Sequence, residues 1–147
     1  MPFALEQLTQ GLTVLAKLDP VSQGTGTTQP MTDIDMSKIQ RLMIILQIGS
    51  VGGAGTVDAS LKESKTAGGT YQAFTNNIAI TQVTASNKVV TIEVRADQLD
   101  ATYRYVQLNL TIGGNAVLVG GVALGGEAEY KPAKSQDIAA VTQRLVA

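Results

Sequence analysis

Three closely spaced pairs of carboxylates are the residues whose types and spacing could do acid–base chemistry. They are Asp33 with Asp35, Asp97 with Asp100, and Glu127 with Glu129. A catalytic pair of acids needs surroundings that drive the two pKa values apart. Residues i and i+2 of a strand share a face, so Glu127 and Glu129 could meet, but solvation at the surface is the better explanation, and the Asp33–Asp35 pair is explained by turn chemistry. Asp33-Ile34-Asp35 also supplies too few oxygens for a calcium loop.

Other catalytic groups are scarce. The 147 residues include no cysteine, no histidine and no tryptophan, which excludes thiolate nucleophiles, sulfur-rich metal sites and the usual base near neutral pH. No Lys-Ser/Thr pair follows the glycines at 52–53 or 120–121, so neither is a phosphate loop. Within a strand, glycines such as 120–121 mark a bulge or a close approach of another backbone. We therefore expect no enzyme, no cofactor and no metal.

Tyr71, Tyr103 and Tyr105 could form a small patch that binds a carbohydrate or a receptor. An aromatic ladder that stabilises cross-strand pairing is the simpler interpretation. Asn109-Leu110-Thr111 matches the N-glycosylation triplet, but an outward-facing position of Asn109 in a strand explains it without a sugar.

Charge and targeting signals exclude two kinds of partner. Eleven basic and twelve acidic residues give a net charge of -1, and the basic residues are scattered, which is unlike a nucleic-acid binder. Residues 1–18 lack a basic start and contain Glu6, unlike a secretory signal. The longest apolar run, 42–46, is far shorter than the ~20 residues that span a bilayer. We expect a chain that folds in a cytoplasm and binds neither nucleic acid nor membrane.

Alternating hydrophobicity predicts an all-β fold. Hydrophobic residues make up 44% and aromatic residues 4%, so one aliphatic core is expected. About eight antiparallel strands separated by turn residues favour a β-sandwich or jelly-roll, and the clearest lie at 42–48, 56–63, 90–94 and 106–112. Gly113-Gly114-Asn115 predicts a hairpin over 102–124.

The chain divides into three parts. Residues 1–30 form an N-terminal arm with a first strand at 12–18, 31–131 form the β-sandwich core, and 132–147 form a C-terminal tail. Within the tail, 137–146 can form a short helix with Ser135 as a possible N-cap. Two core segments are ambiguous: 33–39 could hold one helical turn, and 78–83 is either a short strand or a poor turn of helix.

Apolar surface is in excess for one sandwich. Strand 42–48 is nearly continuous in apolar residues and should be a central strand covered on both faces, and 116–124 carries apolar residues on both of its faces. A single sandwich has one interior, so the second faces need a cover, which could be the 1–30 arm, the tail or another subunit. Terminal contacts with a partner are expected from six apolar residues: Phe3, Leu5, Leu8, Ile138, Val141 and Leu145.

A series of segments between Leu12 and Tyr130 resembles a family of small structural proteins of tailed bacteriophages. The resembling segments are Val14-Leu15-Ala16, the run 43–49, the run 55–64, the run 80–84, the run 90–95, the run 104–108 and the glycine-bearing last strand. The resemblance covers most of the chain and contains no catalytic signature.

This resemblance implies a non-enzymatic virion protein, specifically a head decoration or cement protein on the capsid surface. Its expected partner is the major capsid protein, with further copies of itself in a homo-oligomer, a trimer by analogy. It would be assembled in the cytoplasm of a bacterial host. A head–tail connector, a tail structural protein and a carbohydrate- or receptor-binding sandwich are the alternatives.

Overall fold

The computed structural model describes residues 7–128, 133–143 and 145. Short helical turns occur at α1 (Leu8–Gly11), η2 (Ala96–Gln98) and η3 (Ala133–Gln136), of which the last two are 3-10 helices. The strands are β1 (Leu12–Gln23), β2 (Gly26–Thr28), β3 (Ile34–Asp35), β4 (Ile39–Val51), β5 (Thr56–Ser64), β6 (Gln72–Ala73), β7 (Lys88–Arg95), β8 (Tyr105–Gly113) and β9 (Val117–Ala128). The all-β prediction is confirmed.

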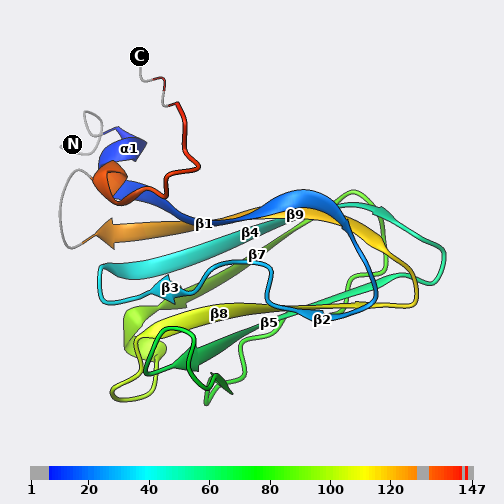
Figure 1. The fold of residues 1–147 in the computed structure, drawn as a ribbon, viewed down its shortest axis with the longest axis horizontal. Coiled ribbons are helices and arrows are strands. Elements are labelled where there is room, and N and C mark those ends of the chain that lie inside the picture. Colours follow the sequence, from blue (N-terminus) through cyan, green and yellow to red (C-terminus); the bar gives the residue numbers. More distant parts are fainter. Residues whose placement is uncertain (1–6, 129–132, 144, 146–147) are drawn as a thin grey trace.

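Two antiparallel sheets face each other in Figure 1. Sheet A has the order β1-β9-β4-β7, and sheet B has the order β2-β8-β5-β6, with the two-residue β3 also paired to β8. Successive strands such as β1 and β2, β4 and β5, and β8 and β9 alternate between the sheets. With the short β3 set aside, this arrangement of strands in two sheets is a jelly-roll.

The core between the sheets is aliphatic, as the composition predicts. Inward side chains of both sheets fill it, and Phe74 is the aromatic residue among those buried there. The other members are mainly Ile, Leu, Val and Met, for example Leu42, Ile44, Leu46, Leu108 and Leu110, each fully buried. Such branched side chains pack well on a pleated surface and lose little freedom in doing so.

The predicted hairpin over 102–124 is wrong. β8 lies in sheet B and β9 in sheet A, so the turn at 114–116 crosses from one layer to the other instead of pairing its strands. Gly114 does have a positive φ of 70°, and a Cβ there would collide with the carbonyl oxygen of Ala54. The local turn signal is correct, but each strand buries its apolar face in the shared core by joining a different sheet.

β4 is central in sheet A, between β9 and β7, as its apolar run predicts. The expectation that both of its faces are covered is wrong for the described residues. Leu42, Ile44, Leu46 and Ile48 are buried, but on the other face Met43 is 36% exposed. The strand is therefore covered by the core on one side only.

Residues 12–28 of the predicted arm belong to the sandwich. β1 pairs with β9 along most of its length, although bulges interrupt the register after Val14 and after Leu18, and β2 pairs with β8. The Gly/Thr-rich part of the arm thus contains a strand of sheet B. A short helical turn does precede β1, at Leu8–Gly11.

The predicted tail helix is displaced. The helical turn of the tail is η3, at Ala133–Gln136, and residues 137–143 and 145 are not helical. Asp137 explains the change, because its carboxylate accepts hydrogen bonds from the Thr13 hydroxyl (2.9 Å) and the Val14 amide (2.8 Å). The next residue, Ile138, donates its amide to the Val14 carbonyl at 2.9 Å. The tail therefore docks on the edge of β1 through Asp137 and Ile138, and a turn closed by the Val141 amide and the Ile138 carbonyl follows.

Neither of the two ambiguous core segments contains a helical turn. The segment 33–39 contains β3 and no helical turn. Residues 78–83 run beside β5 through isolated bridges, Val57 with Val83 and Ser60 with Ala79, so this segment is an irregular edge strand. Tertiary pairing decides these segments because their local helix propensity is weak.

Candidate interaction surface

The outer face of sheet A is the most distinctive surface of the molecule. Residues directly opposite in antiparallel strands share a face, so the registers Met43–Leu124 and Ile45–Val122 place these four side chains together outside the core. Leu118 and Val89 extend the same surface and are 45% and 64% exposed. We call this set the outer A face: Val14, Met43, Ile45, Val89, Leu118, Val122 and Leu124.

Glycines of β9 allow close backbone contacts and leave a hollow in this face. A Cβ at Gly121 would lie 2.5 Å from the Ile45 carbonyl oxygen, and one at Gly120 would lie 3.1 Å from Pro20. The sequence-based expectation that 120–121 marks a close backbone approach is thus confirmed. Because Gly120 has no side chain, the outer surface of β9 between β1 and β4 is hollow at this position.

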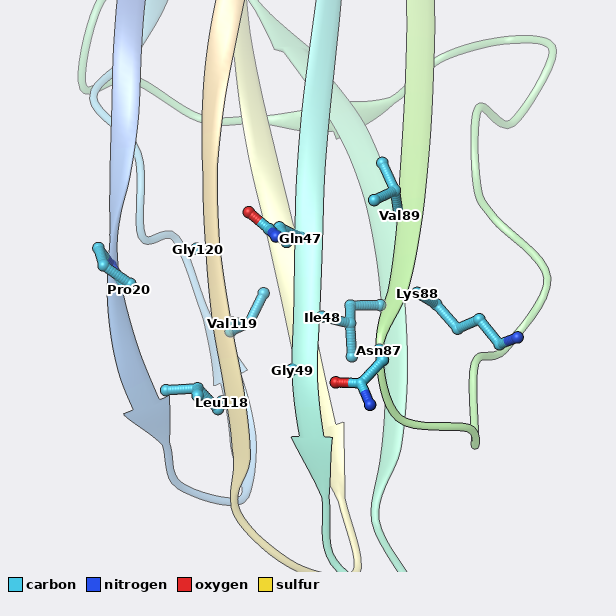
Figure 2. A pocket seen from close by; sticks show the side chains of 10 residues that line it. All are labelled: Pro20, Gln47, Ile48, Gly49, Asn87, Lys88, Val89, Leu118, Val119 and Gly120. Carbon is cyan, nitrogen blue, oxygen red and sulfur yellow. The ribbon is translucent and has the colours of Figure 1, made fainter.

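Two adjoining shallow hollows share Gly120, Pro20 and Gln47 in their walls. One has a volume of about 270 Å³ and is bounded by Leu118 and Val89, as Figure 2 shows. The other, of about 350 Å³, continues along the sheet past Ile45, Val122 and Lys17. Both are open depressions with largely apolar walls, which suits the side chains of a partner surface better than an enclosed small molecule.

Charged residues border the outer A face in pairs of opposite sign. Lys17 pairs with Asp19, Arg41 with Glu127 at 3.4 Å, and Arg95 with Asp97 at 3.0 Å. Glu93, opposite Met43 in the register, has no ion-pair partner among the described residues. These three exposed pairs contribute little to stability, but they leave the face almost neutral.

The outer face of sheet B is polar by comparison. Its registers place Asp58 beside Thr111 and Lys62 beside Gln107. Side chains there bond to one another: the Thr27 and Thr111 hydroxyls lie 2.8 Å apart, and Gln29 donates to Asn109 at 3.2 Å. Asn109 faces outward in register with Ser60, as expected, although Gln29 covers it. The two outer faces of the sandwich thus differ sharply in polarity.

The terminal residues predicted as an interface lie in different surroundings. Leu8 is 79% and Leu145 99% exposed, whereas Ile138 and Val141 are half-buried. Phe3 and Leu5 lie outside the described residues. Ile138 follows the residue that docks on β1 and bonds to β1 itself, so part of the tail serves its own domain. That any of these residues contacts a partner stays a prediction.

The acidic pairs do not form a catalytic pair in the part of the chain that the structure describes. Arg104 donates two hydrogen bonds to Asp35, at 2.7 and 2.6 Å, and holds the pKa of that carboxyl far below its ordinary value. Asp97 is bound by Arg95, and Asp100 accepts from Gln72 and Thr75. Glu129 lies outside the described residues. Each described carboxylate of these pairs thus has a structural partner.

Sequence reasoning missed one buried acid, Glu63. It lies in the predicted strand 56–63, but it does not belong to any of the closely spaced acidic pairs. The alternation of β5 points it inward, with Val57 and Leu61, and its side chain is fully buried. It accepts a hydrogen bond from the Asp100 amide at 3.0 Å. Burial raises the pKa of the Glu63 carboxyl, and the amide bond lowers it by less. Its position between β5 and the 96–104 segment indicates a structural role.

Two of the three tyrosines have a cation against the ring. The Lys65 ammonium lies 5.2 Å from the centre of the Tyr103 ring, and the Arg104 guanidinium lies 5.3 Å from the centre of the Tyr105 ring. Burial and the neighbouring Asp33 carboxylate raise the pKa of the Tyr71 hydroxyl. A cation therefore lies over one ring face of Tyr103 and one of Tyr105, where a sugar would otherwise stack.

Neither a membrane-spanning helix nor a metal cluster occurs among the described residues. None of the described helices is long and apolar enough to cross a membrane. Residues 7–128, 133–143 and 145 contain no group of three or more acidic side chains placed to hold a metal ion.

Comparison with known proteins gives a likeness of fold. No protein-family model matches the chain, and no curated protein matches its sequence. A chain in the structure of infectious bursal disease virus, strain Gt, superimposes with a TM-score of 0.50 and 14% identity, over 84% of this chain and 33% of that one. A chain from strain Gx gives a TM-score of 0.35 and 8% identity, over 86% and 32%. This chain spans about a third of the length of each, and the likeness to the Gt chain at 14% identity is one of fold alone.

The sequence contains most of the signal for this surface. Leu118, Val122 and Leu124 are recognisable as apolar residues that face away from the core side of their strand. Val89 is missed by the same reasoning, because it begins its strand and the alternation of Val90, Ile92 and Val94 points to the other face. A residue pattern cannot tell which of two apolar faces is covered until the sheets are placed.

Proposed function

We propose that the protein is a non-enzymatic structural component of a virus particle, and specifically a head decoration protein of a tailed bacteriophage. One observation carries the proposal: the outer face of sheet A presents a cluster of apolar side chains, of which Met43, Val89, Leu118 and Val122 are 36–64% exposed, and the ion pairs around them leave it nearly neutral. Patches of this kind on soluble domains mark interfaces.

The fold supports this function without establishing it. Jelly-rolls occur in viral capsid domains, lectins and cupins, so architecture alone leaves the function open. A structure of infectious bursal disease virus contains a chain with a similar fold, which is consistent with a building block of a particle. A cupin would use metal ligands. A carbohydrate-binding site built on the tyrosines would need aromatic rings that are accessible to a sugar. The cations against Tyr103 and Tyr105 argue against the lectin alternative.

We assign attachment to the viral capsid to the two terminal segments of the chain. Leu8 and Leu145 are both largely exposed, and Figure 1 places α1 and the C-terminal segment at the same end of the sandwich. Exposed apolar side chains at one end of a rigid body can insert into a neighbouring protein while the outer A face remains available. The major capsid protein is the proposed neighbour.

The copy number of the chain in purified particles tests the proposal. Particles from the host that encodes the chain should contain it in amounts comparable to the shell protein, measured by quantitative mass spectrometry. A few copies per particle would favour a connector or tail component. Complete absence from purified particles would exclude a virion role.

A further inference from the structure

The outer A face has the size of a stable protein interface. Four strands about 4.8 Å apart, each contributing about ten residues at about 3.4 Å per residue, span roughly 650 Å². Two such faces in contact would bury roughly 1,300 Å², which falls within the range of stable complexes, about 1,200–2,000 Å². A second copy of the same face is therefore large enough to cover it.

The charges on the face favour a partner of the same kind. Arg41–Glu127 and Arg95–Asp97 neutralise one another at the border of the face, so a strongly charged partner gains little from binding there, whereas the Lys17–Asp19 pair is exposed at the edge of the sheet. The remaining charge asymmetry runs across the sheet. Lys17 lies on edge strand β1, and Glu93 lies on the opposite edge strand, β7.

We propose that the outer A face pairs with the same face of a second copy of this chain, about a two-fold axis parallel to the strands. This proposal concerns the partner of the apolar face and so rests on the assembly role proposed above. Sheets packed face to face keep their strands within about 30° of each other, which this axis allows. A two-fold interface uses the same patch on both copies.

The charge pattern selects this axis. With the axis parallel to the strands and between β9 and β4, β1 of one copy faces β7 of the other. Lys17 belongs to the register row of Val122 and Ile45, and Glu93 belongs to the next row, with Met43. Lys17 of one copy then comes within side-chain reach of Glu93 of the other. An axis across the strands would instead oppose Lys17 to Lys17 and Glu93 to Glu93.

The hollow and the projecting side chains of the face are also compatible with this arrangement. The same axis brings β9 of one copy opposite β4 of the other. The hollow above Gly120 thus faces the projecting side chains of β4, among them Ile45 and Gln47. Hollows on one sheet can receive side chains of the other, as in the interior of a sandwich.

Sedimentation of the purified full-length chain tests the pairing. We expect a concentration-dependent dimer, or a larger assembly built from it, and Val122→Lys should raise its dissociation constant at least tenfold. Thr27→Lys, on the exposed outer face of β2, is the matched control and should leave association unchanged. Circular dichroism and thermal unfolding establish that both variants fold. A wild-type chain that stays monomeric at about 100 µM overturns the proposal, as does unaltered association of a folded Val122→Lys variant.

A charge exchange tests the axis. Lys17→Glu and Glu93→Lys should each weaken association, and the double variant should restore it to within about threefold of wild type. Failure of the double variant to recover overturns the two-fold arrangement. These measurements use the isolated chain, so they are independent of its presence in particles. A dimer that is absent from particles contradicts the decoration role alone, and an abundant particle protein that is monomeric contradicts the pairing alone.

Discussion

At the scale of single residues, polar groups inside or beside the core are held by specific partners. Arg104 fixes Asp35 through two hydrogen bonds and at the same time lies over Tyr105, so one cation connects β3 with β8. Glu63 connects β5 with the segment after η2 through the Asp100 amide. Neither group lies in a catalytic arrangement. Their chemistry stabilises the connections between strands.

The buried carboxyl of Glu63 predicts a pH dependence of stability. Its pKa is raised in the folded chain, so the folded state takes up its proton more readily than the unfolded state. The free energy of unfolding should therefore rise as pH falls from about 7 toward the ordinary glutamate pKa, about 4.3. Below about pH 4 the lowered pKa of Asp35 acts oppositely, because stability is lost as the Asp35 carboxylate of the ion pair with Arg104 is protonated.

Urea unfolding at about pH 7 and about pH 5 measures this effect. Glu63→Gln should reduce the gain in stability on acidification relative to wild type. Asp58→Asn, which alters a carboxylate on the outer face of sheet B, is the control and should keep the wild-type gain. An unchanged gain in the Glu63→Gln variant would contradict a raised pKa at this site.

At the scale of elements, β9 approaches both of its neighbouring strands closely. It lies between β1 and β4 and needs small residues on both of its faces. Gly121 and Gly125 face the core side, where a Cβ at Gly125 would lie 2.7 Å from Leu15. These glycines lower the intrinsic strand propensity of β9. The close backbone approach that they allow compensates for that loss.

Gly121→Ala tests this close approach. The added Cβ would meet the Ile45 carbonyl oxygen, so the variant should lose about 1–3 kcal/mol of stability through strain in the sheet. Gly53→Ala is the matched control, because no atom lies within 4 Å of the added Cβ, and its stability should change by less than about 1 kcal/mol. Chemical denaturation measures both. Equal stabilities of the two variants would show that β9 can move away from β4.

At the scale of the whole molecule, the jelly-roll is a rigid body with three different surfaces. Sheet B presents polar side chains, sheet A presents the apolar outer A face, and one end carries the exposed Leu8 and the tail. Such a division allows one small domain to contact its own copies and a shell at the same time. On a lattice of many copies, weak contacts add through high effective concentration.

Removal of residues 1–10 tests attachment to the particle independently of the folding of the domain. No residue of α1 is buried, so the truncated chain should keep the thermal unfolding midpoint of the full chain to within a few degrees. Its binding to particles that lack the protein should weaken at least tenfold, measured by co-sedimentation. The Thr27→Lys variant serves as the control that retains binding. Undiminished binding of the truncated chain would remove the N-terminal segment from the attachment site.

The sequence alone is sufficient to predict the fold class, the aliphatic core and most strand positions. These follow from local alternation of polar and apolar residues, which is a property of each segment by itself. Val57, Ala59 and Leu61 in β5, and Leu108, Leu110 and Ile112 in β8, are assigned to the inside in this way and are buried. The absence of cysteine and histidine likewise narrows the chemistry that is open to the chain, because it removes the side chains themselves.

Only the tertiary structure decided which sheet each strand joins and which apolar faces stay open. β8 and β9 are joined by a good hairpin turn but pair with different neighbours, since pairing depends on residues far away in the sequence. The outer face of β4 carries the apolar Met43 and Ile45 in the middle of an apolar run, so the run by itself predicts that both faces are covered. Its exposure follows from the number of layers in the fold, which no local pattern encodes.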